Sequence, residues 1–218
     1  MMSAKYPRTP HLPWSPGVGN DDRIIESLGV ILNSTCVITE KLDGSNLCLT
    51  QESVFARSHS GAPKHASFDL AKQFHAEIRS FIDLNESWFF EYCYAVHSIK
   101  YEALRHFLNL IGIRNDSMGV WSSWGDVTLT AEVIEIPTVP VLMEIEPIRN
   151  IEELQKLTER LAKMPSIYGP QREGIVIRVK ESFKDEDFGR SIAKWVRPNH
   201  VQTDEHWTNK MIEKQPIR

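Results

Sequence analysis

Charged residues interrupt or end several apolar runs that otherwise have the composition of β-strands. A lysine follows VITE, a glutamate lies inside WFFEYCYAV, and a second glutamate precedes GIVIRV. Two basic residues flank WV, and an arginine ends SVFA. In chain order these residues are Lys41, Arg57, Glu91, Glu173, Lys194 and Arg197. Because charged groups embedded in apolar strands need partners, the pattern predicts carboxylates facing basic groups across a groove. Such a groove would bind an anionic substrate and a divalent cation.

The wider pattern indicates an α+β fold, in which locally paired antiparallel strands are flanked by irregularly placed helices. Strands are expected over residues 35–42, 45–51, 53–59, 87–96, 117–124, 172–180 and 190–198. Helices are expected over 21–32, 67–82, 99–113 and 150–164. The first three strands are predicted to form an antiparallel meander or a hairpin pair. Neither a dinucleotide-binding glycine motif nor a P-loop motif occurs, so any nucleotide must be bound in another way.

The length of 218 residues favours a single domain spanning 1–218. Four prolines between Tyr6 and Gly19 predict that residues 1–20 form an extended arm. Residues 198–218 are expected to form a short polar tail.

Bulk composition narrows the function classes. The net charge of −4 argues against a protein that coats nucleic acid through bulk charge. No signal peptide and no apolar stretch of bilayer length is evident, so a cytoplasmic protein without membrane association is expected. Cys36, Cys48 and Cys93 lie in apolar runs without CxxC spacing, which predicts buried, reduced thiols.

The stretch KLDG at 41–44 has two interpretations. Lys41 can be a nucleophile if desolvation or nearby cations lower its pKa, and Gly44 would let a ligand approach the backbone closely. Alternatively, Lys41 is a surface lysine at a hairpin, since Asp-Gly is a common turn dipeptide. The other charged residues on strands favour the first interpretation.

These motifs together resemble those of a known superfamily. KLDG, then Glu91 in an aromatic strand, EGIVIR at 173–178 and a lysine-bearing strand at 191–197 resemble the covalent nucleotidyltransferases: RNA ligases, DNA ligases and mRNA capping enzymes. Asn46 resembles the RNA ligases, because DNA ligases usually carry an arginine there. The stretches EYCYAVHSIKYEALRHFL and KWVRPNHVQTDEHW further resemble phage and bacterial RNA ligases of the nick-sealing kind.

The resemblance implies an ATP-grasp-like nucleotidyltransferase core that uses ATP and Mg²⁺ or Mn²⁺. Lys41 would attack the α-phosphate of ATP to give lysyl-AMP, which is passed to a 5′-phosphate end and displaced by a 3′-hydroxyl. The expected catalytic residues are Lys41, Asp43, which would orient Lys41, and Lys194, which would contact phosphate. RNA, or RNA/DNA, with such ends is the implied substrate, and RNA repair the implied context.

The resemblance also implies ligand-binding roles. Glu173 would hold the metal, and Glu91 would contact the metal or the ribose. Trp121 would stack on the adenine, although a tryptophan in an apolar run also fits a core position. The implied nucleotide-binding set is Glu40, Gly44, Asn46, Arg57, Glu91, Trp121 and Arg197.

Several alternatives stay open on the sequence. The chain could be the core of a DNA ligase or a capping-type guanylyltransferase, or a non-catalytic module that binds RNA ends. No OB-fold is expected after Arg197, so full sealing would need an accessory protein or the core surface alone. Residues 199–207 are expected to serve in capping or docking rather than as metal ligands, and His59 is a candidate substrate contact.

Overall fold

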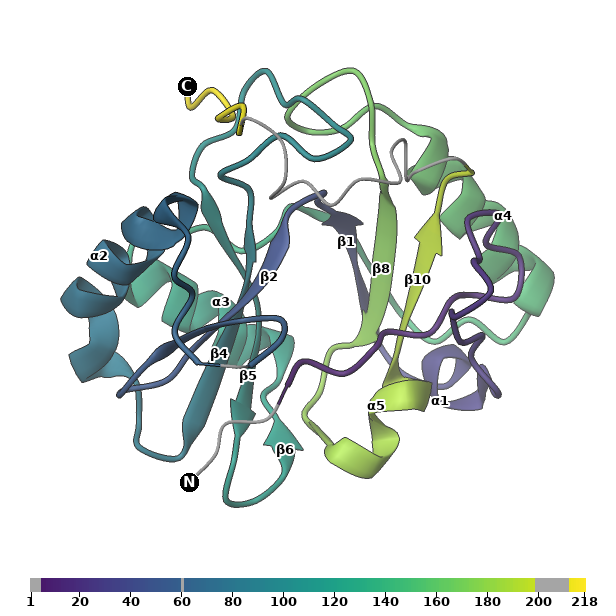
Figure 1. Cartoon of the computed structure of the whole chain (residues 1–218). Helices are drawn as coiled ribbons and strands as arrows, with labels where there is room; N and C mark the ends of the chain where they lie inside the picture. Colours follow the sequence, from purple (N-terminus) through teal and green to yellow (C-terminus); the bar gives the residue numbers. More distant parts are fainter. Residues whose placement is uncertain (1–4, 60, 199–211) are drawn as a thin grey trace.

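The computed structural model describes residues 5–59, 61–198 and 212–218. Two antiparallel sheets form the two halves of the molecule (Figure 1). The four-stranded sheet has the order β10-β8-β1-β7, built from Ile192–Val196, Gly174–Val179, Cys36–Lys41 and Val141–Ile145. The six-stranded sheet has the order β3-β2-β4-β5-β6-β9, built from Val54–Ala56, Ser45–Leu49, Glu86–Tyr92, Leu108–Asn115, Val120–Trp121 and Phe183–Lys184. The predicted α+β class is confirmed.

Helices cover the outer faces of both sheets (Figure 1). Helices α2 (Asp69–Ile78) and α3 (Trp124–Val133) flank the six-stranded sheet. Helix α4 (Ile151–Lys163) and the short helices α1 (Gly29–Leu32) and α5 (Phe188–Ser191) flank the four-stranded sheet. The amphipathic pattern of α4 and its N-cap residue Asn150 explain why this helix was predictable, because both signals are local.

The chain changes sheets between β1 and β2. The predicted hairpin across Asp43 and Gly44 is therefore wrong, although both strands are found where expected. Leu42 is buried, and the Asp43 carboxylate accepts hydrogen bonds from the loop after β4. These contacts direct the chain across the molecule. Only β2 and β3 form the expected antiparallel hairpin.

Two expected helices are replaced by other structure. Residues 21–32 are helical only over Gly29–Leu32, because Ile25 N–H donates to His11 O and so ties this segment to the N-terminal arm. Strand β5 occupies the second half of the expected helix at 99–113. The side chains of β5 face a helix layer on one side and the four-stranded sheet on the opposite side. A continuous apolar run here is therefore as compatible with a buried strand as with a helix.

Strand β7 and helix α3 had no counterpart among the predicted elements. Strand β7 is an edge strand with a bulge opposite Ile38 and Thr39, and its exposed residues hide the usual alternation. Helix α3 begins at Trp124 with Ser123 as its N-cap, inside the stretch expected to be a strand at 117–124.

The N-terminal arm is an extended segment that passes over β10 and forms backbone hydrogen bonds with it (Figure 1). The N–H of Leu12 donates to Lys194 O, and the Lys194 N–H donates to Pro10 O. At the other end of the chain, residues 212–218 lie against the loop between β4 and β5. In the described segments, no helix is long and apolar enough to cross a membrane. The three cysteines are buried and free, as predicted.

Candidate active site

A cavity of about 880 Å³ lies between the two sheets and is partly covered by the N-terminal arm. Strand β1 contributes to one wall and β2 to the other. Seven of the sequence-predicted residues line it, namely Glu40, Lys41, Gly44, Asn46, Arg57, Glu91 and Lys194. The structure thus brings together groups that are up to 154 positions apart in the chain, from 40 to 194.

Lys41 is held by an ion pair at the end of β1. Its Nζ lies 2.7 Å from Glu173 Oε2, and its side chain is 27% exposed. The pair forms because Lys41 is opposite Gly174 in the β1/β8 register, which places Glu173 beside it. Burial alone would lower the pKa of Lys41, but the charges of Glu173 and Glu91 outweigh burial and raise it. The expectation of a lowered pKa is therefore wrong for the ligand-free protein, where the amine is held as an ammonium.

Two carboxylates flank this ammonium. Burial raises the pKa of Glu91 to about 7, with Glu173 adding to the rise and Lys41 opposing it. Burial also raises the pKa of Glu173 against the influence of Lys41. Glu91 Oε1 accepts a hydrogen bond of 3.0 Å from the Gly44 N–H. Both acids therefore bind protons more readily than exposed glutamates do, and Glu91 titrates near neutral pH.

The carboxylate pair fits a divalent cation bound together with a nucleotide. Hard cations prefer carboxylate oxygen, and Mg²⁺ commonly uses one or two carboxylates plus substrate phosphates. Among the described residues, no three His, Cys, Asp or Glu side chains form a cluster that could hold a metal alone. Glu173 and Glu91 would thus hold a cation only with the help of phosphate and water oxygens.

Asp43 positions the motif and does not face the lysine amine directly. Its Oδ2 accepts hydrogen bonds from the Ser98 N–H at 2.7 Å and the Ile99 N–H at 2.8 Å. Its own N–H donates to Tyr101 Oη at 2.8 Å. Gly44 follows where a Cβ would lie 2.8 Å from the Tyr92 carbonyl oxygen, so only glycine fits this approach between strands.

Lys194 faces the cavity from β10 and is paired with the arm. Its Nζ lies 3.2 Å from Asp22 Oδ1. Asp22 Oδ2 also accepts from the Gly19 N–H at 3.0 Å and lies 3.2 Å from Nε2 of the buried His11. Burial lowers the pKa of Lys194, and Asp22 offsets part of that effect. Sequence reasoning placed Asp22 only within the expected helix over 21–32 and missed this contact.

Arg178 is a second cavity residue that sequence reasoning missed as a site residue. Its side chain is buried on β8, donating to Ile111 O at 3.0 Å and Ser122 O at 3.2 Å, and its guanidinium lies 5.1 Å from the Trp124 ring centroid. Burial lowers its pKa. The signal was available, because Arg178 breaks the apolar alternation of GIVIRV.

Ile111 and Val176 give the cavity apolar surfaces from opposite sheets. Ile111 lies at a bulge in β5, where Phe89 pairs with Gly112 and Phe90 with Leu110, so it has no partner in the β4 register. A bulge can turn a side chain out of the regular alternation. For this reason, the alternation of apolar residues in the sequence could not show that Ile111 faces the cavity.

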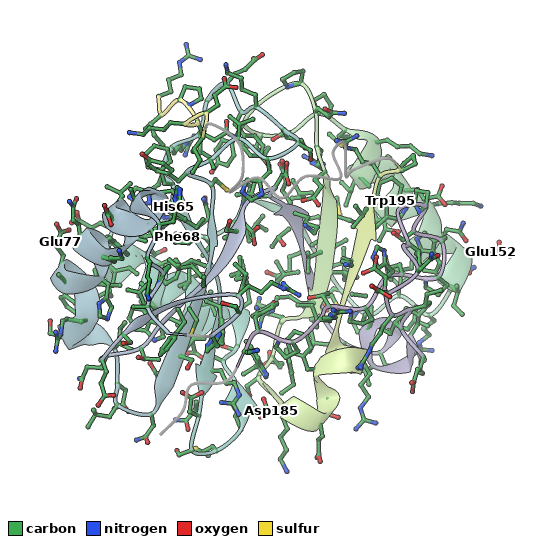
Figure 2. All side chains as sticks on the ribbon, viewed as in Figure 1. His65, Phe68, Glu77, Glu152, Asp185 and Trp195 are labelled. Carbon is green, nitrogen blue, oxygen red and sulfur yellow. The ribbon has the colours of Figure 1, made fainter. Side chains whose placement is uncertain are left out.

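Trp121 is not a stacking residue in this structure. Its side chain is 1% exposed, and it packs with Phe89 and Phe188 at centroid distances of 5.2 and 5.0 Å. Its Nε1–H donates to Asp185 Oδ1 at 2.9 Å; Asp185 lies near the α5 end of the molecule (Figure 2). The alternative core interpretation of Trp121 describes its position, because β6 turns this indole into the aromatic cluster.

Arg197 and Glu40 also differ from expectation. Arg197 lines a smaller cavity with Trp195 and Arg172, and residues of α4 line the same cavity. Strand alternation explains this, since a lysine at 194 and an arginine at 197 point to opposite faces. Glu40 is among the residues that line the large cavity, but its buried carboxylate lies 3.4 Å from Arg172 Nη2 and accepts from the Ile167 N–H at 3.0 Å. Neither side chain therefore points a charge at the Lys41 site.

The other expected residues lie at the edges of the site. Asn46 pairs with Glu91 in the β2/β4 register, and its Oδ1 has no hydrogen-bond partner among the described residues. Arg57 is exposed at the cavity rim. His59 stacks on Phe55, and it is not among the residues lining either cavity of the described chain. The expected capping role of residues 199–207 concerns residues outside the described part.

Two antiparallel sheets enclose a lysine and two carboxylates, as the resemblance to the covalent nucleotidyltransferases implied. Residues 34–196 match the family model described as RNA ligase, and the chain belongs to that family. No curated protein sequence matches it significantly.

Solved structures of the RNA ligase of Naegleria gruberi share this fold. A mutant with ATP and Mn is 14% identical, with a TM-score of 0.60 over 92% of this chain and 58% of that one. The enzyme with PPi is 16% identical, with a TM-score of 0.58 over 89% and 61%. A mutant with AMP and Mn is 15% identical, with a TM-score of 0.55 over 90% and 60%. The chain thus spans about three fifths of these neighbours.

The first prediction concerns the charge state of Lys41. Without nucleotide or divalent cation, Glu173→Gln should lower the pKa of Lys41, because the burial that lowers it remains while the main opposing charge is removed. At about pH 9, acylation of Lys41 should then be at least about tenfold faster than in the wild type. Peptide mass spectrometry after brief acylation measures this rate, with the exposed Lys180 as internal control. An unchanged Lys41 rate would contradict the assigned ion pair.

The second prediction separates Trp121 from the ligand site. Trp121→Phe should lower the free energy of unfolding by about 1 to 3 kcal/mol, through lost packing and the lost bond to Asp185. Binding of ATP should change less than about twofold, because the indole does not line the cavity. Urea unfolding and calorimetric titration measure the two quantities. A large loss of ATP affinity in a stably folded variant would restore the stacking role.

Proposed function

We propose that this chain is the nucleotidyltransferase core of an ATP-dependent RNA ligase that forms lysyl-AMP on Lys41. The observation that carries the proposal is the Lys41 amine, 2.7 Å from Glu173 Oε2 in a cavity that Lys194 also lines. Membership of the RNA ligase family supports it.

The first step is attack of Lys41 Nζ on the α-phosphorus. The N–P bond forms, and the bond to the pyrophosphate oxygen breaks. The ammonium must first lose a proton, and Glu173 Oε2, 2.7 Å from Lys41 Nζ, already accepts a hydrogen bond from it. Because burial raises the pKa of Glu173, that oxygen accepts a proton more readily than an exposed glutamate would. A bound divalent cation supplies positive charge that offsets the phosphates and lowers the pKa of Lys41.

Basic side chains around the cavity would stabilise charge on the phosphate oxygens. Lys194 is the strongest candidate, because it is partly buried and its partner Asp22 belongs to the arm. To bind a phosphate, Lys194 Nζ would only have to exchange the Asp22 carboxylate for a phosphate oxygen. Arg57 at the rim and the amide of Asn46 are further donors. Preorganised donors of this kind typically contribute about 100-fold or more to rate.

The apolar part of the cavity would hold the adenine. Ile111 and Val176 face it from opposite sheets, and Val139 lies beside them in the lining. A flat base between two aliphatic side chains buries apolar surface without needing an aromatic partner. This arrangement takes over the role that sequence reasoning gave to Trp121.

Later steps would pass AMP to a 5′-phosphate and join that end to a 3′-hydroxyl. RNA with such ends is the proposed substrate, on the strength of the family match. An acidic chain should bind nucleic acid weakly and with strong salt dependence. Help from an accessory protein remains part of the proposal for full strand sealing.

The third prediction tests the covalent step. With α-labelled ATP and Mg²⁺ or Mn²⁺, the wild type should retain label through denaturing electrophoresis, and Lys41→Ala should retain none. Lys180→Ala is the matched control, because it removes an exposed lysine paired with Glu144. Absence of label with both ATP and GTP, or equal labelling of Lys41→Ala, would sink the proposal. Label from GTP alone would indicate a capping-type enzyme.

The fourth prediction compares Lys194 in β10 with Arg197, which follows the end of that strand. Lys194→Ala should slow formation of lysyl-AMP by about 100-fold. Arg197→Ala should slow it by less than about threefold, because its side chain lines the smaller cavity behind the sheet. Single-turnover labelling at saturating ATP measures both rates. Equal losses would mean that Arg197 acts on phosphate after all.

A further inference from the structure

The C-terminal segment 212–218 is built into the loop that follows β4. The Val96 N–H donates to Glu213 O at 2.8 Å, and the Gln215 N–H donates to Tyr94 O at 2.8 Å. Gln215 is 1% exposed, whereas the flanking Glu213 is exposed. A glutamine amide at this depth requires partners for both of its ends.

Both ends of the Gln215 amide are used by the same loop. Its Nε2 donates to Ile99 O at 2.7 Å, and its Oε1 accepts from the Tyr101 N–H at 2.9 Å. The side chain thus holds the two residues on either side of Lys100. Lys100 itself is exposed and pairs with Glu213.

The opposite side of this loop holds the lysine motif. Asp43 Oδ2 accepts from the Ile99 N–H at 2.8 Å, and Tyr101 Oη accepts from the Asp43 N–H at 2.8 Å. Ile99 and Tyr101 therefore bind Gln215 through one set of groups and Asp43 through another. Two residues before Asp43 is Lys41, and the next residue is Gly44, whose N–H holds Glu91.

We propose that Gln215 is a positioning residue for the nucleophile, acting through Ile99, Tyr101 and Asp43. The inference rests on the proposed function of Lys41. Without the amide, the buried Ile99 carbonyl and Tyr101 N–H lose their partners, and the loop must shift to satisfy them. That shift moves the donors that fix the Asp43 carboxylate and changes the approach of Lys41 to Glu173. The C-terminal segment thereby sets the geometry of a site more than 170 positions earlier in the chain.

The experiment compares Gln215→Leu and Gln215→Glu with Glu213→Gln in the full chain. Leucine keeps the approximate size of the side chain without its hydrogen bonds, and glutamate keeps only the acceptor for the Tyr101 N–H. At saturating ATP, Gln215→Leu should slow lysyl-AMP formation by at least about tenfold, with ATP affinity changed by less than about twofold. Gln215→Glu should give an intermediate loss. Glu213→Gln, which alters an exposed pair, should match the wild type.

A double-mutant cycle distinguishes positioning from general stabilisation. In an Asp43→Ala/Tyr101→Phe background, Gln215→Leu should cost less than about twofold in rate, because both contacts through which the loop holds residue 43 are already removed. Multiplicative losses would overturn the proposal and leave Gln215 a structural anchor. Wild-type rates in a folded Gln215→Leu variant would overturn it equally. Thermal unfolding of each variant defines the temperature at which all are folded.

A readout without ATP keeps this inference separate from the proposed function. Acylation of Lys41 should change at least about threefold in Gln215→Leu, with Lys180 unchanged, because the surroundings of the amine are altered. If the wild type never forms lysyl-AMP, the proposed function fails, and this measurement still decides whether Gln215 positions Lys41. An unchanged Lys41 reactivity would refute positioning whatever the protein catalyses.

Discussion

The ion pair between Lys41 and Glu173 is the interaction on which the site depends. It forms only because β1 and β8 are antiparallel neighbours in a register that sets Lys41 opposite Gly174. A shift of one residue would turn the lysine to the back of the sheet. Both strands lie inside the four-stranded sheet, with β7 and β10 outside them, so the register is fixed by pairing on both sides. Lys41, the proposed nucleophile, therefore lies on one of the most constrained parts of the backbone.

Charge balance gives this pair its chemical meaning. One ammonium faces two carboxylates. Both carboxylates raise the pKa of Lys41, and the charge of Glu173 also raises the pKa of Glu91. The ligand-free site thus keeps Lys41 protonated. Positive charge brought to the carboxylates would weaken their hold on the amine. The same groups that restrain Lys41 would then help to activate it once a cation and phosphates arrive.

Sequence reasoning found the strands that carry the site but not every direction in which their side chains point. Lys41, Glu91, Glu173 and Lys194 were identifiable because each breaks an apolar run. Trp121 and Arg197 were misplaced because motif order gives a position along the chain and not a face of a strand. The place of Ile111 in the cavity could not be predicted from the sequence, because a β-bulge interrupts the alternation of side chains in β5. The partnership of Asp22 with Lys194 depends on the path of the arm, which no local pattern encodes.

Two successive charged residues on β1 show how one strand serves both faces. Lys41 meets Glu173 on the cavity side, while Glu40 meets Arg172 on the α4 side. The partners are themselves adjacent, so the same pair of neighbouring strand ends is joined by an ion pair in front and another behind. Removing one member of the rear pair would leave a buried charge without its partner, which is costly. Glu40 was expected to bind nucleotide, yet its position gives it a different use: it fixes the strand end from which Lys41 extends. Glu40, the acid before Lys41, thus affects the site by fixing the backbone of β1. Glu173, the acid on the neighbouring strand, affects it by pairing with the Lys41 amine.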